Sequence, residues 1–291
     1  MPAHNYSIWS RALHRLALGK RYVAEISFDL ERLLNAADVS DVKCQPHVFV
    51  AGFARAGTTV LMRELYATGV YRSLTYRDMP FPLAPNSWRS ISGSSQVSKI
   101  ATERAHGDGI LVDFDSPEAL EEVFWRVHCG EKYIFGDRLV PMEGDTNTDA
   151  DFVDYVALLL HATKSKRYLS KNNNNILRLG TLARVFPEAT IVIPFREPAA
   201  QASSLLQQHM HFLARHKEDA CARDYMTWLG HHEFGQDHRP FIFNDEQYTA
   251  FGGYDPSLDL GYWLKLWTNT YRHILANAPA NCLLVSYERL C

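Results

Sequence analysis

The sequence predicts an α/β fold with a central parallel sheet. Two short runs, HVFVAG at 47–52 and ATIVIPF at 189–195, are continuously apolar and rich in β-branched and aromatic residues. Such runs are typical of strands that are buried on both faces of a sheet. Segments with apolar residues at helical spacing lie between them. Strands that alternate with helices favour a parallel sheet covered by helices on both faces.

Local signals predict the other elements. Residues 8–36 have apolar side chains at helical spacing and are expected to form one or two amphipathic helices within an N-terminal extension, 1–45. Ser116-Pro117-Glu118 has the residue types of a helix start. Further helices are expected at 58–69, 151–163, 175–185, 198–214 and 257–278, and further strands at 167–170 and 281–288. A long loop is expected at 80–96 and irregular aromatic chain at 230–256.

Length and composition exclude several classes of protein. The 291 residues contain no evident linker, so we expect one domain over 1–291. The formal net charge of −3 argues against binding of nucleic acid through the overall field. No apolar run is long enough for a signal peptide or a membrane span, which predicts a cytoplasmic protein. The five cysteines lack any CxxC, which disfavours a zinc or disulfide framework.

The segment from Gly52 to Thr59 has the spacing of a phosphate-binding loop, GxxxxGK[ST], with Thr58 in place of the lysine. Two glycines allow the backbone to wrap an anion, and the N–H groups at a helix start point toward it. Thr58 and Thr59 add hydroxyl donors, and Arg55 adds a cation suited to phosphate or sulfate. A plain glycine-containing turn is the alternative. The combination with a strand, two threonines and an arginine favours the anion site.

The second strand ends differently from that of a nucleoside triphosphatase. A magnesium-dependent enzyme of that kind carries an aspartate at this strand end, whereas this strand is followed by Arg196. The loop lysine is also missing. Both departures disfavour a Mg–nucleotide enzyme. They favour a nucleotide held by arginines and hydroxyls without a metal ion.

GFARAGTT followed by a helix resembles the 5′-phosphosulfate loop of sulfotransferases that use 3′-phosphoadenosine 5′-phosphosulfate (PAPS). FREPAAQASSL at 195–205 resembles their 3′-phosphate motif, and SKNNNNILRLGTLARVFPEATIVIPFRE and SYERL resemble two further elements. The resemblance implies a P-loop-like three-layer fold, with PAPS as donor and adenosine 3′,5′-bisphosphate (PAP) as product. Ala54 and Ala56 depart from the usual loop, where Pro and Ser are common. The implied cofactor-binding residues are Arg55, Ala56, Gly57, Thr58, Thr59, Arg196 and Ser204.

The same resemblance implies the catalytic residues. Arg55 and Lys171 would be the cations near the transferring sulfuryl group. A solvated loop lysine is the alternative for Lys171, and the functional interpretation is slightly favoured. For the base, Asp78 matches the position of a glutamate in many family members, and His106 is the second candidate. Glu121 and Glu122 are expected on a solvated helix face.

Three other groups of residues could contribute to a site: asparagines, histidines and aromatic residues. Asn172 is expected to bind acceptor or cofactor, and Asn174 and Asn175 to form a loop and helix cap. The histidines of HMH and HHE are too close in sequence to share one helix face, which disfavours a metal site. The aromatic residues of 225–254 are expected to wall an acceptor pocket, stack on adenine or simply pack.

The predicted function is transfer of a sulfuryl group from PAPS to a hydroxyl of a small-molecule, glycan or lipid acceptor. A P-loop kinase or NTPase and a non-catalytic nucleotide-binding module are the alternatives. In sulfotransferases further helices follow an element like SYERL, whereas this chain stops soon after Arg289. The chain is therefore expected to be truncated at its C-terminus.

Overall fold

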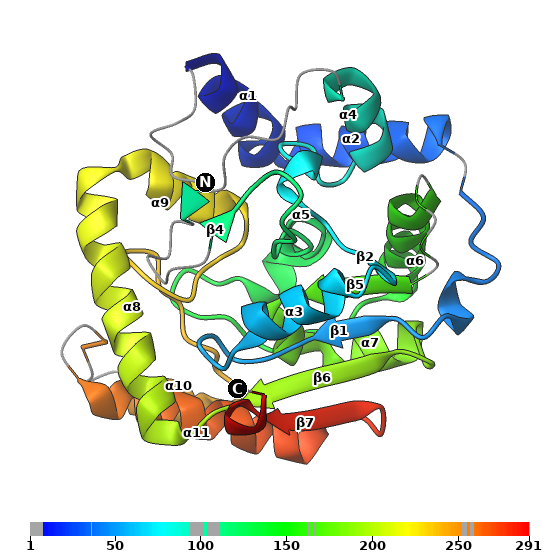
Figure 1. The fold of residues 1–291 in the computed structure, drawn as a ribbon. Coiled ribbons are helices and arrows are strands. Elements are labelled where there is room, and N and C mark those ends of the chain that lie inside the picture. Colours follow the sequence, from blue (N-terminus) through cyan, green and yellow to red (C-terminus); the bar gives the residue numbers. More distant parts are fainter. Residues whose placement is uncertain are drawn as a thin grey trace.

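A computed structural model gives an α/β fold on one central sheet (Figure 1). It describes residues 8–35, 37–93, 102–103, 111–161, 163, 165, 167–251, 255–256 and 259–290. Five strands of these residues form a parallel sheet in the order β2-β5-β1-β6-β7, which confirms the predicted fold class. The strands are β1 (Val48–Val50), β2 (Tyr71–Arg72), β5 (Arg167–Lys171), β6 (Thr190–Phe195) and β7 (Cys282–Ser286). Strands β3 (Thr102–Glu103) and β4 (Leu111–Val112) pair separately as an antiparallel ribbon.

Helices surround this sheet on both faces (Figure 1). The helices are α1 (Ile8–Gly19), α2 (Arg21–Leu34), α3 (Thr58–Ala67), α4 (Pro85–Ser92), α5 (Glu122–Tyr133), α6 (Thr146–His161), α7 (Leu179–Val185), α8 (Pro198–Glu218), α9 (Ala220–Trp228), α10 (Asp245–Phe251) and α11 (Leu260–Asn277). Short 3-10 turns are η2 (Val42–Cys44), η3 (Tyr76–Asp78), η4 (Asn173–Arg178) and η5 (Tyr287–Arg289). None of the helices in the described ranges has the length and apolar character that a bilayer crossing requires.

Strand β1 separates two apolar layers because successive side chains of a strand point to opposite faces. Val48 and Val50 pack in a small cluster with Met62 of α3. Phe49 points the other way and stacks on Phe186, in the large core formed with α5, α6 and α11. Both faces of the central strand are therefore buried, which explains why its sequence is continuously apolar.

The parallel register brings three strand ends to one edge of the sheet. Val50, the last residue of β1, pairs with Lys171 of β5 and with Val192 of β6. The segments that follow these strands therefore begin close together. In open parallel sheets such an edge is where ligands usually bind.

Most of the predicted elements are confirmed, with small shifts at their ends. The expected 8–36 helix divides into α1 and α2, which meet at Lys20 in an extended conformation. The expected helix at 175–185 begins as the 3-10 turn η4 and continues as α7. The predicted strands at 47–52, 167–170, 189–195 and 281–288 correspond to β1, β5, β6 and β7.

Two predictions were wrong. The expected loop at 80–96 contains helix α4, which begins at Pro85. The helix expected from Ser116 begins only at Glu122. Ser116 does not cap a helix because its hydroxyl donates to Asp113 Oδ1 at 2.8 Å, and Pro117 forms a β-bridge with Thr75. In addition, helices α9 and α10 were not predicted.

Candidate active site

The loop between β1 and α3 has the backbone shape of an anion-binding turn. Gly57 has φ 86° and Arg55 has φ 68°, both in the left-handed region. That region is uncommon for a residue with a side chain, so Arg55 needs support from its surroundings. The N–H of Ala56 donates to the Phe53 carbonyl at 3.3 Å and closes the turn. The helix start that follows offers backbone N–H groups to an anion.

Close packing explains both glycines of this loop. A Cβ on Gly52 would lie 2.6 Å from Thr58 Cγ2 and 2.8 Å from Pro194 Cγ. A Cβ on Gly57 would lie 2.5 Å from Tyr287 Cδ2. These distances are below van der Waals contact, so any larger residue would displace the loop.

Helix α8 holds the loop from the side. Arg55 Nε donates to Ser204 Oγ at 3.0 Å, so two residues that the sequence assigned to separate motifs are in direct contact. The buried amide of Gln201 donates to the Ala54 carbonyl at 2.8 Å and accepts from Trp267 Nε1 at 2.9 Å. These bonds fix the loop relative to α8 and α11.

Arg196 follows β6 and lies beside the C-terminal turn η5. Its guanidinium is 4.9 Å from the ring centroid of Tyr287, a cation–π contact. The backbone N–H of Glu197 donates to Glu288 Oε1 at 2.9 Å. The Glu197 carboxylate in turn accepts from Ala199 N and Ala200 N, which caps α8. Arg196 is thereby held at the start of the helix that carries Ser204.

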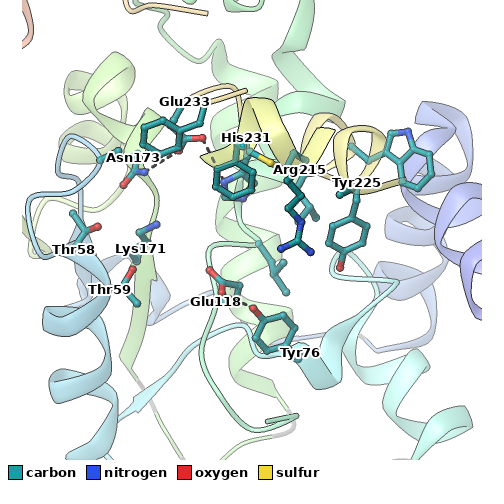
Figure 2. A pocket seen from close by; sticks show the side chains of 18 of the residues that line it. Thr58, Thr59, Tyr76, Glu118, Lys171, Asn173, Arg215, Tyr225, His231 and Glu233 are labelled. Carbon is teal, nitrogen blue, oxygen red and sulfur yellow. Dashed lines mark hydrogen bonds and ion pairs between the residues drawn. The ribbon is translucent and has the colours of Figure 1, made fainter. Parts of the chain in front are cut away.

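A cavity of about 570 Å³ opens above this edge of the sheet. Lys171, at the end of β5 and only 8% exposed, lines it near Thr58 and Thr59 (Figure 2). Ala56 is buried and Ser204 reaches the site through Arg55. The predicted residues that line the cavity are Arg55, Gly57, Thr58, Thr59, Lys171 and Arg196.

Asp78, expected as the base, lies in a buried ion pair instead. Its side chain is 1% exposed and accepts from Arg72 Nη2 at 2.7 Å. Its second oxygen accepts from the backbone N–H of Thr75 at 2.7 Å, closing a capping box around η3. Asp78 is thus a structural residue of the turn. The second candidate, His106, lies outside the described residues.

The turn that Asp78 closes presents Tyr76 to the cavity. Tyr76 OH donates to Glu118 Oε2 at 2.7 Å, and Glu118 Oε1 accepts from the N–H of Ala119 at 2.8 Å. Both side chains line the cavity, and Figure 2 shows Glu118 between Lys171 and Arg215. Sequence reasoning missed Glu118 because it was read as the first turn of a helix.

Glu121 and Glu122 are buried, so the predicted solvated face was wrong. Glu122 Oε1 accepts from Arg178 Nη2 at 3.0 Å and from the Tyr133 hydroxyl. Glu121 accepts from Trp125 Nε1 and Asn175 Nδ2, both at 3.1 Å. A buried charge needs such partners to offset its desolvation.

The four asparagines of 172–175 are all buried, and two of them bond to the buried pair of glutamates: Asn172 to Glu122 and Asn175 to Glu121. Asn172 donates to Glu122 Oε2 at 2.6 Å and accepts from the N–H of Asn174, so it caps η4. Asn173, not Asn172, lines the cavity, and it donates to Glu233 Oε1 at 2.8 Å. The cap is therefore made by Asn172, whereas it was predicted at Asn174 and Asn175, and the residue that lines the cavity is Asn173, whereas Asn172 was predicted.

His231 and Glu233 form an ion pair on the cavity wall. His231 Nδ1 is 3.6 Å from Glu233 Oε2, and its Nε2 is 3.1 Å from the Ala119 carbonyl oxygen. Burial favours the neutral ring, but the Glu233 carboxylate outweighs it and raises the pKa of His231. Burial would raise the pKa of Glu233, yet His231, Lys171 and Asn173 hold it well below its usual range. Each group of the pair therefore favours the charged form of the other.

Burial favours the neutral ring of three other histidines of this region. Burial lowers the pKa of His209 and His232 to about 4 and that of His238 to about 3. In the part of the chain that the structure describes, no three His, Cys, Asp or Glu side chains are grouped to hold a metal ion. Of the aromatic segment, Tyr225, Trp228 and Phe234 line the cavity.

Comparison with known proteins identifies the family. A family model described as "Sulfotransferase family" matches residues 46–291. This chain belongs to the sulfotransferase family. The comparison with curated proteins finds no significant match.

Solved structures similar to this sulfotransferase come from bacteria. Sulfotransferase STF1 of Mycobacterium tuberculosis H37Rv is 14% identical, with a TM-score of 0.48, 99% of this chain covered and 74% of that chain. STF9 of Mycobacterium avium is 13% identical, with a TM-score of 0.40, and the match covers 99% of this chain and 81% of STF9. A sulfotransferase of Alicyclobacillus acidocaldarius is 14% identical, with a TM-score of 0.37, and the match covers 84% of this chain and 74% of that protein.

Proposed function

We propose that this sulfotransferase moves a sulfuryl group from PAPS to a hydroxyl of a small-molecule, glycan or lipid acceptor. One observation carries the proposal. Three cations, Arg55, Lys171 and Arg196, line the same cavity as the glycine loop at the end of β1. A cluster of cations beside backbone N–H groups suits an anionic donor with several phosphate or sulfate oxygens.

The residues present fit such a donor. Gly52 and Gly57 leave no room for a Cβ because Thr58, Pro194 and Tyr287 pack against them, so the loop is held in one shape. Thr58, Thr59 and the backbone N–H groups at the start of α3 would bind the 5′-phosphosulfate end, while Ala56 closes the turn beside them. Arg196 and Ser204 would bind the 3′-phosphate, with Tyr287 holding Arg196 by its cation–π contact. No metal ion is needed for this set of contacts.

When bound, PAPS supplies an activated sulfuryl group on a phosphate leaving group. Arg55 and Lys171 would stabilise the negative charge that develops on the oxygens around sulfur during in-line transfer. Lys171 is well suited because it ends a buried strand and is almost fully enclosed. The fixed strand end positions its ammonium without the entropy cost of a free lysine side chain.

We propose Glu118 as the base that takes the acceptor proton. It faces the cavity and is oriented by Tyr76 OH and the N–H of Ala119, so its direction is set before substrate arrives. Asp78 would act as a positioning residue, because its carboxylate closes the turn that presents Tyr76. His106 is the alternative base.

The rival is a P-loop kinase or NTPase, or a nucleotide-binding module without catalysis. The proposal is tested by titrating the protein with PAP and, separately, with ATP and Mg²⁺, using calorimetry. Tight PAP binding in the absence of metal is expected, together with label transfer from ³⁵S-PAPS to an acceptor panel. Preference for ATP with Mg²⁺ would overturn the proposal. PAP binding without any transfer would also overturn it, in favour of a nucleotide-binding module without catalysis.

A further inference from the structure

The half of the cavity remote from the loop has walls that the donor site does not use. Helix α1 contributes Arg11 and Arg15, α8 contributes Arg215, and α9 contributes Tyr225 and Trp228. Figure 2 shows Arg215 and Tyr225 across the cavity from Thr58, Thr59 and Lys171. These helices are far apart in sequence but packed together in space, since a Cβ on Gly19 of α1 would lie 3.2 Å from the ring of Trp228.

The charge of this remote half is positive. Three guanidinium groups line it, and an arginine remains protonated at all physiological pH values. Asp224 is the acidic residue of the same wall, and it is exposed on α9. His14 adds no charge because burial lowers its pKa. Glu233, toward the middle of the cavity, is already paired with His231.

The remaining surface of this half is flat and apolar. Tyr225 and Trp228 are half-buried aromatic side chains that hold α9 against α1, and the Tyr225 ring lies 5.9 Å from that of His14. Phe212 and Leu229 are buried behind them and also line the cavity. Aromatic walls of this kind bind ring-shaped, apolar bodies.

We infer that the acceptor is a hydroxyl compound with an apolar ring body and an anionic group, a carboxylate or a phosphate. Its hydroxyl would lie beside Glu118, its ring against Tyr225 and Trp228, and its anionic group at Arg215 and the two arginines of α1. A guanidinium recognises either anion by paired N–H bonds. The inference rests on the proposed function, because it takes the loop end as the donor site.

A matched pair of acceptors tests this inference. The probes are 3-(4-hydroxyphenyl)propanoate and its amide, which share a phenol and a ring but differ in charge. Binding is measured by calorimetry on protein saturated with PAP, and turnover is measured with ³⁵S-PAPS. The carboxylate is expected to bind at least about tenfold more tightly than the amide, and to have the higher kcat/KM.

Two variants locate the effect. Arg215→Gln and, separately, Arg15→Gln on the exposed face of α1 are expected to bring the ratio of the two affinities toward one, with the affinity for PAP unchanged. Equal affinities in the unaltered protein, or no binding of either probe to the PAP complex, would overturn the inference while the donor site stands. Failure to bind PAP at all would overturn the proposed function itself.

Discussion

The two ends of the cavity are built in opposite ways. The proposed donor end is a single strand–loop–helix unit at the sheet edge, in which neighbouring side chains pack so closely on Gly52 and Gly57 that an added Cβ would lie 2.6 Å and 2.5 Å from them. The proposed acceptor end is assembled from α1, α8 and α9, each contributing a few side chains. Glu118 lies between the two ends (Figure 2).

This difference separates the properties that each end controls. A rigid loop on a buried strand suits a donor that never changes. Side chains on peripheral helices can be exchanged without disturbing the sheet, so they suit the selection of the acceptor. Substitutions at the two ends should therefore alter different measured constants, and substitutions in the framework beneath should alter stability alone.

The largest effect on turnover is expected at Glu118, which lies between the two ends of the cavity. Glu118→Gln removes the proposed base while keeping its shape, so turnover should fall by about 10²–10⁴-fold with the PAP affinity unchanged. Asp78→Asn is the comparison variant: Arg72 loses its buried partner, so urea unfolding should show a lower free energy of unfolding. Because Asp78 acts only through Tyr76, kcat should fall less than in Glu118→Gln. The measurements are kcat and the Kd for PAP. Full activity in Glu118→Gln would refute the assignment.

The framework beneath both ends should affect stability. Arg178→Met leaves Glu122 as a buried charge without its ion pair, which should lower the free energy of unfolding by about 3–5 kcal/mol. Arg184→Met is the matched control: in its ion pair with Asp149 the arginine side chain is 45% exposed, and loss of the pair should cost less than about 1 kcal/mol. Urea unfolding followed by circular dichroism measures both. Equal losses in the two variants would contradict the buried-network account.

The donor end should control PAP affinity. Arg55→Ala removes the loop cation and its bond to Ser204, and should weaken PAP binding by about 10- to 100-fold. Arg63→Ala, on α3 but bonded to the Leu111 carbonyl, is the control and should leave PAP binding unaltered. Calorimetric titration gives both constants. An unchanged Kd in Arg55→Ala would place the donor elsewhere.

The smallest effect concerns the charge of His231. The raised pKa of His231 depends on the Glu233 carboxylate. In Glu233→Gln the effect of burial remains without that carboxylate, so the pKa of His231 should fall below 6.5. In the unaltered protein this pair stabilises the fold below pH 6.5, and the stabilisation is lost as pH rises through the folded-state pKa. An NMR titration of the His231 ring tests both. A pKa that is the same in the variant would show that Glu233 does not control this charge.

The donor end could be predicted from sequence because its residues are local. Strand, loop and helix occupy consecutive residues, and loop spacing alone places Thr58 and Thr59 at the helix start. The contact between Arg55 and Ser204 needed the fold, but both residues were identified separately from family motifs. Short-range patterns of this kind are where sequence reasoning is strongest.

The rest of the site depends on contacts between distant segments. Glu122 looked solvated because its partner Arg178 is 56 residues away and no local pattern joins them. Glu118 reaches the cavity because Pro117 bridges to Thr75, which prevents the helix that the residue types favour. The arginines of α1 meet α9 only through tertiary packing. At each of these points, tertiary packing overrides the structure that the local sequence favours.

The central claim is that the donor binds on the loop between β1 and α3, clamped by α8. Hydrogen exchange measured by mass spectrometry, with and without saturating PAP and without added metal, tests it directly. PAP should slow exchange of the backbone amides of residues 52–59 and 196–204 more than elsewhere in the chain. Protection that is absent from both segments, or that requires ATP and Mg²⁺ in place of PAP, would contradict the claim.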